Sequence, residues 1–219
     1  MPSAERRIVI LISGRGSNME AIVNACKSGS LNGTVAAVIS NRPDAKGLST
    51  ASAAGIETEA IDHKAYESRD SFDRALAEAI DSYRPDVLVL AGFMRILTET
   101  FVAKFLGKMI NVHPSLLPDY PGLNTHQRAI DNGDDEAGAT VHYVTGELDG
   151  GPAILQGRVA IREDDTADAL AARILPTEHQ MLVTAVAWHL EGRLMHGDSG
   201  AFLDDALLPL RGVDWSTLA

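Results

Sequence analysis

The sequence predicts an α/β protein built on a doubly wound, mostly parallel sheet flanked by helices. Short β-branched runs alternate with longer amphipathic segments over the first half of the chain. These runs are apolar throughout, which indicates strands that are buried on both faces by helices. The 219 residues, 45% of them hydrophobic and 22% charged, suffice for one sizeable core. We therefore expect one domain over residues 1–219, with residues 200–219 as a C-terminal tail.

The first half of the chain follows a β-α-β order. The predicted strands are Ile8–Ile12, Val35–Ile39, Val87–Leu90 and Met109–Val112. The predicted helices are Asn18–Lys27 and Ser71–Tyr83, the second with Ser68 or Ser71 as its N-cap. This order is typical of parallel strands joined by helical crossovers.

The pattern changes in the second half of the chain. Ala139–Val144 and Pro152–Ile161 are predicted as strands with no helix between them. A long helical stretch then covers Thr166–Leu190, and Pro176 could interrupt it. No repeat, low-complexity tract or linker divides the chain.

The charge and the cysteine content exclude several classes of protein. A net charge of −11 without clustered Lys and Arg argues against nucleic acid as a partner. Cys26 is the only cysteine, and no CxxC or Cys/His cluster indicates a structural metal, so a reducing cytoplasm fits best. The apolar run after Arg6 and Arg7 is too short for an export signal or a membrane span.

A glycine-rich turn, Ser13–Asn18, joins the first strand to the first helix. Backbone N–H groups and the helix dipole favour a phosphate there. Met19 stands where a dinucleotide fingerprint needs its third glycine, and a Walker lysine is missing, so a phosphomonoester or sugar phosphate is the simpler ligand. Gly14 and Gly16 could equally do no more than permit a tight turn.

An amide, an imidazole and a carboxylate are the candidate catalytic groups. Asn111 and His113 close a predicted strand, and side chains two residues apart on an extended chain point to the same side. Both could therefore reach one oxygen at the sheet edge where open α/β sheets bind ligands. Prolines stiffen the stretch 114–121 that follows. Asp149 precedes two glycines, so turn formation is the competing explanation for it.

Other residues have weaker support for a functional role. Surface or packing roles are expected for the histidines His63, His142, His179 and His189. The run Gly92–Leu97 could belong to the core or form an apolar wall for a flat ring.

Several sequence blocks together match one family. They are SGRGSN, the Ser-Asn at Ser40, LAGFMRIL, INVHPSLLPDYPG, the THQ at Thr125, ELDGGPAILQ and the TEH ending at His179. In this order and spacing, from Ile8 to about Leu208, the chain resembles the folate-dependent phosphoribosylglycinamide formyltransferases of purine biosynthesis. The resemblance implies the formyltransferase fold, whose N-terminal half is Rossmann-like. It also implies the substrates glycinamide ribonucleotide and 10-formyltetrahydrofolate, with no metal.

The resemblance also assigns residues to roles. It places Gly16, Ser17, Asn18 and Glu178 on the ribonucleotide. It places Arg69, Met94, Arg95, Ile96, Leu97 and Asn111 on the folate. It makes Asn111, His113 and Asp149 the catalytic set. The chain departs from common members at Arg15, Asp119, Asn124 and Leu175.

The expected chemistry is direct attack of the ribonucleotide amine on the formyl carbon. Asn111 and protonated His113 would bind the oxyanion, Asp149 would hold the imidazolium, and no covalent enzyme intermediate is needed. A formyltetrahydrofolate hydrolase and a non-catalytic sugar-phosphate-binding module are the alternatives. A methionyl-tRNA formyltransferase would carry a further C-terminal domain and a basic RNA surface. The protein could be a monomer or a homodimer.

Overall fold

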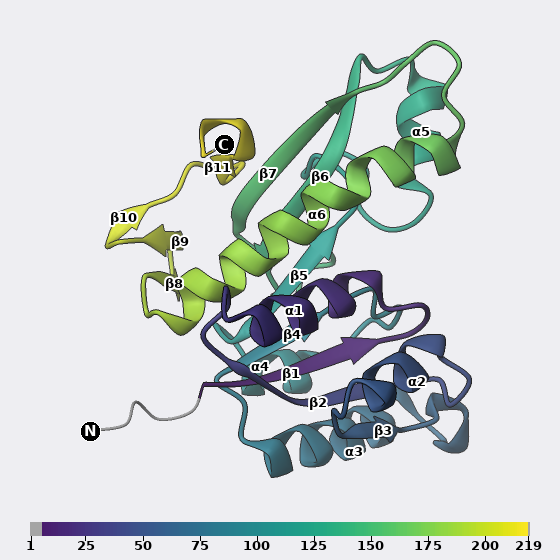
Figure 1. The fold of residues 1–219 in the computed structure, drawn as a ribbon, viewed down its shortest axis with the longest axis vertical. Coiled ribbons are helices and arrows are strands. Elements are labelled where there is room, and N and C mark those ends of the chain that lie inside the picture. The colour runs from purple at the N-terminus through teal and green to yellow at the C-terminus, as the bar shows by residue number, and fades with distance from the viewer. Residues whose placement is uncertain (1–5, 219) are drawn as a thin grey trace. The chain divides into compact units, whose positions relative to one another are not determined.

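The computed structural model describes residues 6–218, and its contacts divide the chain into two compact units (Figure 1). The first unit comprises residues 1–110 and the second comprises residues 111–219. Each unit is described by itself. Within residues 6–218, no helix has the length and apolar character needed to span a membrane.

The first unit is a parallel β-α-β array. Its elements are β1 (Arg7–Ile12), α1 (Ser17–Ser28), β2 (Thr34–Ser40), α2 (Lys46–Ala53), β3 (Thr58–Ala60), the 3₁₀ turn η1 (His63–Ala65), α3 (Arg69–Tyr83), β4 (Val87–Leu90) and α4 (Glu99–Lys104). β1 pairs in parallel with both β2 and β4, and β2 pairs with β3. The order β4-β1-β2-β3 therefore places β1 between β4 and β2, and the four strands end at one edge.

Burial explains why these segments form strands and helices. Five consecutive residues of β1, from Ile8 to Ile12, are fully buried, as are Val87, Leu88 and Val89 in β4. Helix α3 begins with a capping box in which Ser68 accepts from the Ser71 N–H, so Ser68 is the N-cap. The helix ends at Arg84, which adopts the left-handed conformation that stops an α-helix.

The second unit pairs an antiparallel hairpin with a long helix. Its elements are β5 (Met109–His113, which begins in the first unit), α5 (Thr125–Asn132), β6 (Glu136–Tyr143), β7 (Ala153–Ala160), α6 (Ala167–Leu190), β8 (Leu194–Gly197), β9 (Gly200–Leu203), β10 (Ala206–Leu207), β11 (Val213–Asp214) and the 3₁₀ turn η2 (Trp215–Thr217). β6 and β7 are antiparallel, and α6 packs along both (Figure 1).

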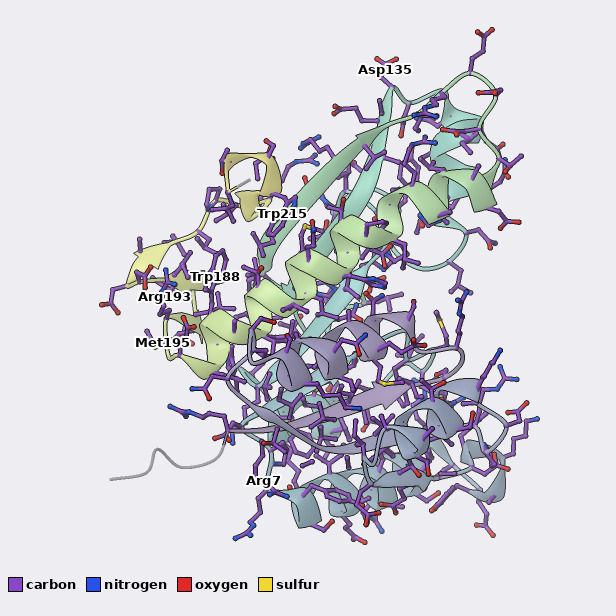
Figure 2. The ribbon with its side chains drawn as sticks, in the orientation of Figure 1. Arg7, Asp135, Trp188, Arg193, Met195 and Trp215 are labelled. Carbon is purple, nitrogen blue, oxygen red and sulfur yellow. The ribbon has the colours of Figure 1, made fainter. Side chains whose placement is uncertain are left out.

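The second unit ends in four short strands. β8, β9 and β10 form a small antiparallel sheet, and β11 adds a parallel strand to β7. Arg193 follows α6, and its guanidinium lies 5.9 Å from the ring centroid of Trp188 (Figure 2). The same guanidinium bonds both carboxylate oxygens of Asp204, at 2.8 and 2.7 Å. Within this unit, β6 lies between β5 and β7.

The predicted fold class is confirmed. Every predicted strand and helix is present, with shifts of up to three residues at its ends. Helix α6 runs through Pro176 without interruption, because buried residues on both sides of it, including Ile174 and Met181, hold the two halves against one core. The prediction did not include α2, β3, α4, α5 or the strands after residue 190.

Candidate active site

Polar side chains of the second unit gather at the end of β5. Asn111 lies within β5, and His113 is its last residue and is 6% exposed. Asp149 lies in the loop between β6 and β7, and its Oδ2 is 3.4 Å from Nδ1 of His113. The structure thus brings the predicted imidazole and carboxylate together.

The side-chain amide of Asn111 is held by His142 of β6. The Nδ2 atom of Asn111 is 3.0 Å from Nε2 of His142, whose Nδ1 is 2.8 Å from the Tyr143 carbonyl oxygen. Burial lowers the pKa of His142 to about 4, so the ring is neutral near pH 7. Its Nδ1–H then donates to the carbonyl, and Nε2 accepts from the Asn111 amide. This arrangement leaves the second Nδ2–H of Asn111 for another acceptor.

Both nitrogens of the His113 ring face acceptors. Nε2 lies 3.0 Å from the carbonyl oxygen of Tyr120, and Nδ1 faces Asp149. Only a ring that carries a proton on each nitrogen can donate to both. The ring therefore has an acceptor for a proton on either nitrogen.

The conformation of the β6–β7 loop aims the Asp149 carboxylate. Asp149 has φ +51°, a left-handed conformation that aspartate tolerates better than most residues. Its Oδ2 also accepts from the Gly122 N–H at 2.9 Å, which fixes the carboxylate beside His113. A Cβ on Gly151 would lie 1.8 Å from the Tyr143 carbonyl oxygen, so only glycine fits there.

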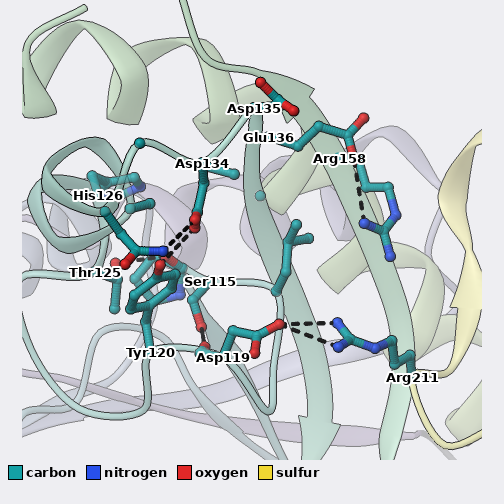
Figure 3. Close-up of a pocket in the computed structure, with 17 residues that line it drawn as sticks. Ser115, Asp119, Tyr120, Thr125, His126, Asp134, Asp135, Glu136, Arg158 and Arg211 are labelled. Carbon is teal, nitrogen blue, oxygen red and sulfur yellow. Dashed lines mark hydrogen bonds and ion pairs between the residues drawn. The ribbon is translucent and has the colours of Figure 1, made fainter.

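The loop after β5 is fixed by side chains of the same unit. The Tyr120 hydroxyl donates to Asp134 at 2.6 Å, and the Arg128 guanidinium lies 5.1 Å from the Tyr120 ring centroid. Asp119 forms an ion pair with Arg211 at 3.2 Å. These residues, except Arg128, line a cavity of about 620 Å³ (Figure 3). Asn111, His113 and Asp149 do not line that cavity, but Tyr120, whose carbonyl oxygen His113 faces, does.

The glycine-rich turn of the first unit leads into the N-terminus of α1. Gly16 is the N-cap of α1 with φ +80°, and it has no side chain to cap the helix. The Gly47 N–H donates to the Gly14 carbonyl at 3.0 Å, and a Cβ on Gly47 would lie 2.5 Å from Ile12. The turn is therefore held in shape by close backbone packing. Ser17 and Asn18 are the first two residues of α1, whose N-terminus favours anions.

The segment after β4 presents large apolar side chains to solvent. Met94 is 66% exposed and Ile96 is 55% exposed, whereas Phe93 is buried. The Arg95 guanidinium lies 5.6 Å from the ring centroid of Phe72. The segment thus combines one buried aromatic side chain with two exposed apolar ones.

The remaining predicted residues occupy helices. Arg69 is the exposed first residue of α3 in the first unit, and Glu178 is buried within α6 in the second. Across residues 6–218, no group of three or more His, Cys, Asp or Glu side chains is arranged to hold a metal ion.

The chain matches the family model described as formyl transferase over residues 6–186. The chain belongs to the formyl transferase family. Phosphoribosylglycinamide formyltransferase of Escherichia coli is 50% identical over 205 residues, which cover 94% of this chain and 97% of the relative. The Haemophilus influenzae protein of the same name is 44% identical over 94% of this chain and 98% of the relative.

Solved structures of formyl transferases share this fold. Phosphoribosylglycinamide formyltransferase from Coxiella burnetii, in complex with CHES, superposes with a TM-score of 0.92 at 46% identity. The match covers 96% of this chain and 99% of that one. Glycinamide ribonucleotide transformylase 1 from Symbiobacterium toebii superposes with a TM-score of 0.89 at 42% identity, over 92% of this chain and 95% of that one. The predicted family resemblance is confirmed, whereas the roles of individual residues stay predictions.

Sequence reasoning missed residues that act through others. The prediction gave His142 only a surface or packing role, but it holds the Asn111 amide. Nothing in the local sequence distinguishes His142 from the other histidines, since its partner lies 31 residues away. Gly47 was missed for the same reason, because its contact with Gly14 is a tertiary one.

The structure explains two of the four residues at which the chain departs from common family members. Asn124 is the N-cap of α5 with φ +57°, a conformation that asparagine accepts. The charge of Asp119 is paired with Arg211, as described above. Nothing in the structure explains Arg15, which is exposed, or Leu175, which is half-buried.

Replacing Gly151 with alanine should destabilise the β6–β7 loop. The new Cβ would overlap the Tyr143 carbonyl, and we expect a loss of roughly 1–3 kcal/mol in the free energy of unfolding. Gly146→Ala is the control, because a Cβ there meets nothing within 4 Å. Urea unfolding of both variants checks this, and equal midpoints would contradict the close-packing explanation.

The neutral state of His142 predicts a loss of stability in acid. Between pH 6.5 and about 4, the unfolded chain binds a proton at His142 and the folded chain does not. The free energy of unfolding should therefore fall as the pH drops through this window. His142→Gln should show a smaller fall in urea titrations at several pH values. A fall as steep as that of the wild type would show that other groups cause it.

Proposed function

We propose that the protein transfers the formyl group of 10-formyltetrahydrofolate to the amine of glycinamide ribonucleotide, giving formylglycinamide ribonucleotide and tetrahydrofolate in purine biosynthesis. The observation that carries the proposal is the cluster of Asn111, His113 and Asp149 in a member of the formyl transferase family. The relatives and solved structures carry names for this same reaction. The reaction needs no metal and no covalent bond to the enzyme.

Asn111 and His113 stabilise the oxyanion in this proposal. Attack of the amine on the formyl carbon forms a tetrahedral intermediate whose oxygen gains negative charge. The free Nδ2–H of Asn111 donates to that oxygen, and its direction is set by the bond to His142. His113 adds a second donor when its Nε2–H turns from the Tyr120 carbonyl to the oxyanion.

Asp149 holds the His113 ring in place and stabilises its positive charge. With Oδ2 near Nδ1 of His113, the carboxylate stabilises the cationic ring that the oxyanion needs. The attacking amine must lose a proton, and the folate nitrogen must gain one when the C–N bond to the formyl carbon breaks. His113 and Asp149 can relay that proton, directly or through water.

The substrate contacts are assigned residue by residue. We place the ribonucleotide phosphate on the N–H groups at Gly16, Ser17 and Asn18, where the helix dipole favours an anion. We place the ribose on Glu178. The folate is assigned to Arg69, to the segment Met94–Leu97 and to Asn111.

We place the enzyme in the cytoplasm, because its single cysteine and strongly acidic composition suit a reducing compartment and small substrates. All of the assigned residues come from one chain. A monomer and a homodimer are therefore both compatible with the proposal.

The decisive assay follows consumption of 10-formyltetrahydrofolate by absorbance, with glycinamide ribonucleotide and then without it. We expect turnover only when the ribonucleotide is present. Consumption without the acceptor would instead identify a hydrolase. Binding of the ribonucleotide without any turnover would identify a non-catalytic module and overturn the role of His113.

Alanine at His113 or at Asp149 should lower kcat by roughly 10²–10⁴-fold, because each removes a charged group from the reacting centre. Ribonucleotide affinity, measured by calorimetry, should stay within about threefold, since the phosphate contacts are elsewhere. Asp205→Ala is a matched control, because Asp205 is exposed and also left-handed, with φ +65°. Near-normal turnover in either active-site variant would contradict the assignment.

A further inference from the structure

The segment that follows β4 is irregular in structure but is anchored at both ends. Residues 92–98 lie between β4 and α4 and contain no helix or strand. The large apolar side chains of Met94 and Ile96 are mostly exposed, so burial does not hold the middle of the segment. Two buried polar side chains from other elements bond its backbone instead, one near each end.

Ser13 holds the first end. Its backbone N–H donates to the Gly92 carbonyl at 3.2 Å, and its hydroxyl accepts from the Met94 N–H at 2.7 Å. The same hydroxyl donates to Oδ1 of Asn41 at 2.6 Å. Ser13 is 4% exposed and Asn41 is 2% exposed. One buried hydroxyl thus links the segments that follow β1, β2 and β4, at the edge where these parallel strands end.

Asp73 holds the second end. It lies on α3 and is 3% exposed, and its Oδ1 has no hydrogen-bond partner among the described residues. Its Oδ2 accepts from the Thr98 N–H at 2.6 Å. Burying a carboxylate without a cationic partner costs folding free energy. A carboxylate that is buried to accept from a single backbone N–H therefore calls for an explanation.

We propose that Ser13 and Asp73 are positioning residues that hold Met94–Leu97 in the shape that receives the folate. The inference rests on the proposed function, which assigns the folate to this segment. Exposed loops lose conformational entropy when they bind a rigid ligand, and anchors at both ends reduce that loss in advance. The two side chains act through the backbone of the segment and do not touch the reacting atoms.

The proposal predicts a selective effect on the folate. Ser13→Ala leaves the Met94 N–H and the Asn41 oxygen without their partner, and Asp73→Ala does the same to the Thr98 N–H. Each should raise the KM for 10-formyltetrahydrofolate by about tenfold, as expected for one buried hydrogen bond. The KM for the ribonucleotide should change less than about twofold, because the Ser13 backbone bond to Gly92 and the Gly14–Gly47 contact are unaffected.

Two further variants separate positioning from general loss of structure. Ser40→Ala is the matched control, since Ser40 is a fully buried serine at the end of β2 whose hydroxyl bonds the backbone carbonyl and N–H of Arg42. It should leave both KM values within about twofold of the wild type. Asp73→Asn retains an oxygen that can accept from Thr98, and it should restore the folate KM toward the wild-type value.

The wild-type assay tests the proposed function, and the variants test the positioning role separately. Absence of wild-type turnover would refute the proposed function, whereas turnover with an unchanged folate KM in folded Ser13→Ala and Asp73→Ala would refute the positioning role. Equal increases in both KM values would also refute it. Calorimetry with tetrahydrofolate gives the same comparison without turnover. If Ser13→Ala does not fold, the Ala and Asn variants of Asp73 decide the matter.

Discussion

Parallel strands joined by crossovers must all end at the same edge of their sheet, and the first unit of this protein depends on that constraint. β1 lies between β2 and β4, so the segments that follow the three strands begin side by side. Backbone groups in these segments are no longer paired within the sheet. Buried side chains such as Ser13 satisfy them, which fixes irregular backbone at an edge where substrates can bind.

Much of the fold could be predicted because its strands are buried on both faces. Continuous apolar runs such as Ile8–Ile12 identify a strand without any knowledge of its neighbours, and Val87–Leu90 was predicted to the residue. Shorter elements such as β3 and α5 have weak local signals, because tertiary contacts contribute most of their stability. Pro176 shows the opposite case, in which a local signal was overruled. Proline disfavours a helix interior, but the buried surface of α6 keeps the helix continuous.

The candidate site was predictable only where one residue carries the chemistry. Asn111 and His113 follow from their place at a strand end, and Asp149 emerged through the motifs that surround it. His142 could not be found in this way, because its role depends on a strand pairing that brings β6 to Asn111. The contact of His113 with the Tyr120 carbonyl could not be predicted either, because every residue has a backbone carbonyl and the sequence does not show which one is used. The missed groups orient other groups, and such partners are set by the three-dimensional fold.

The placement of Asn111, His113 and Asp149 within 39 consecutive residues of one unit has an evolutionary consequence. The glycine-rich turn and the Met94–Leu97 segment belong to the other unit and are encoded upstream of all three. Under the proposed assignment, mutation or recombination in the upstream part of the gene can therefore alter substrate contacts while the three groups proposed for formyl transfer are inherited unchanged. A lineage that gained a new acceptor would be expected to keep Asn111, His113 and Asp149 and to diversify the acceptor contacts, most of which lie upstream of them.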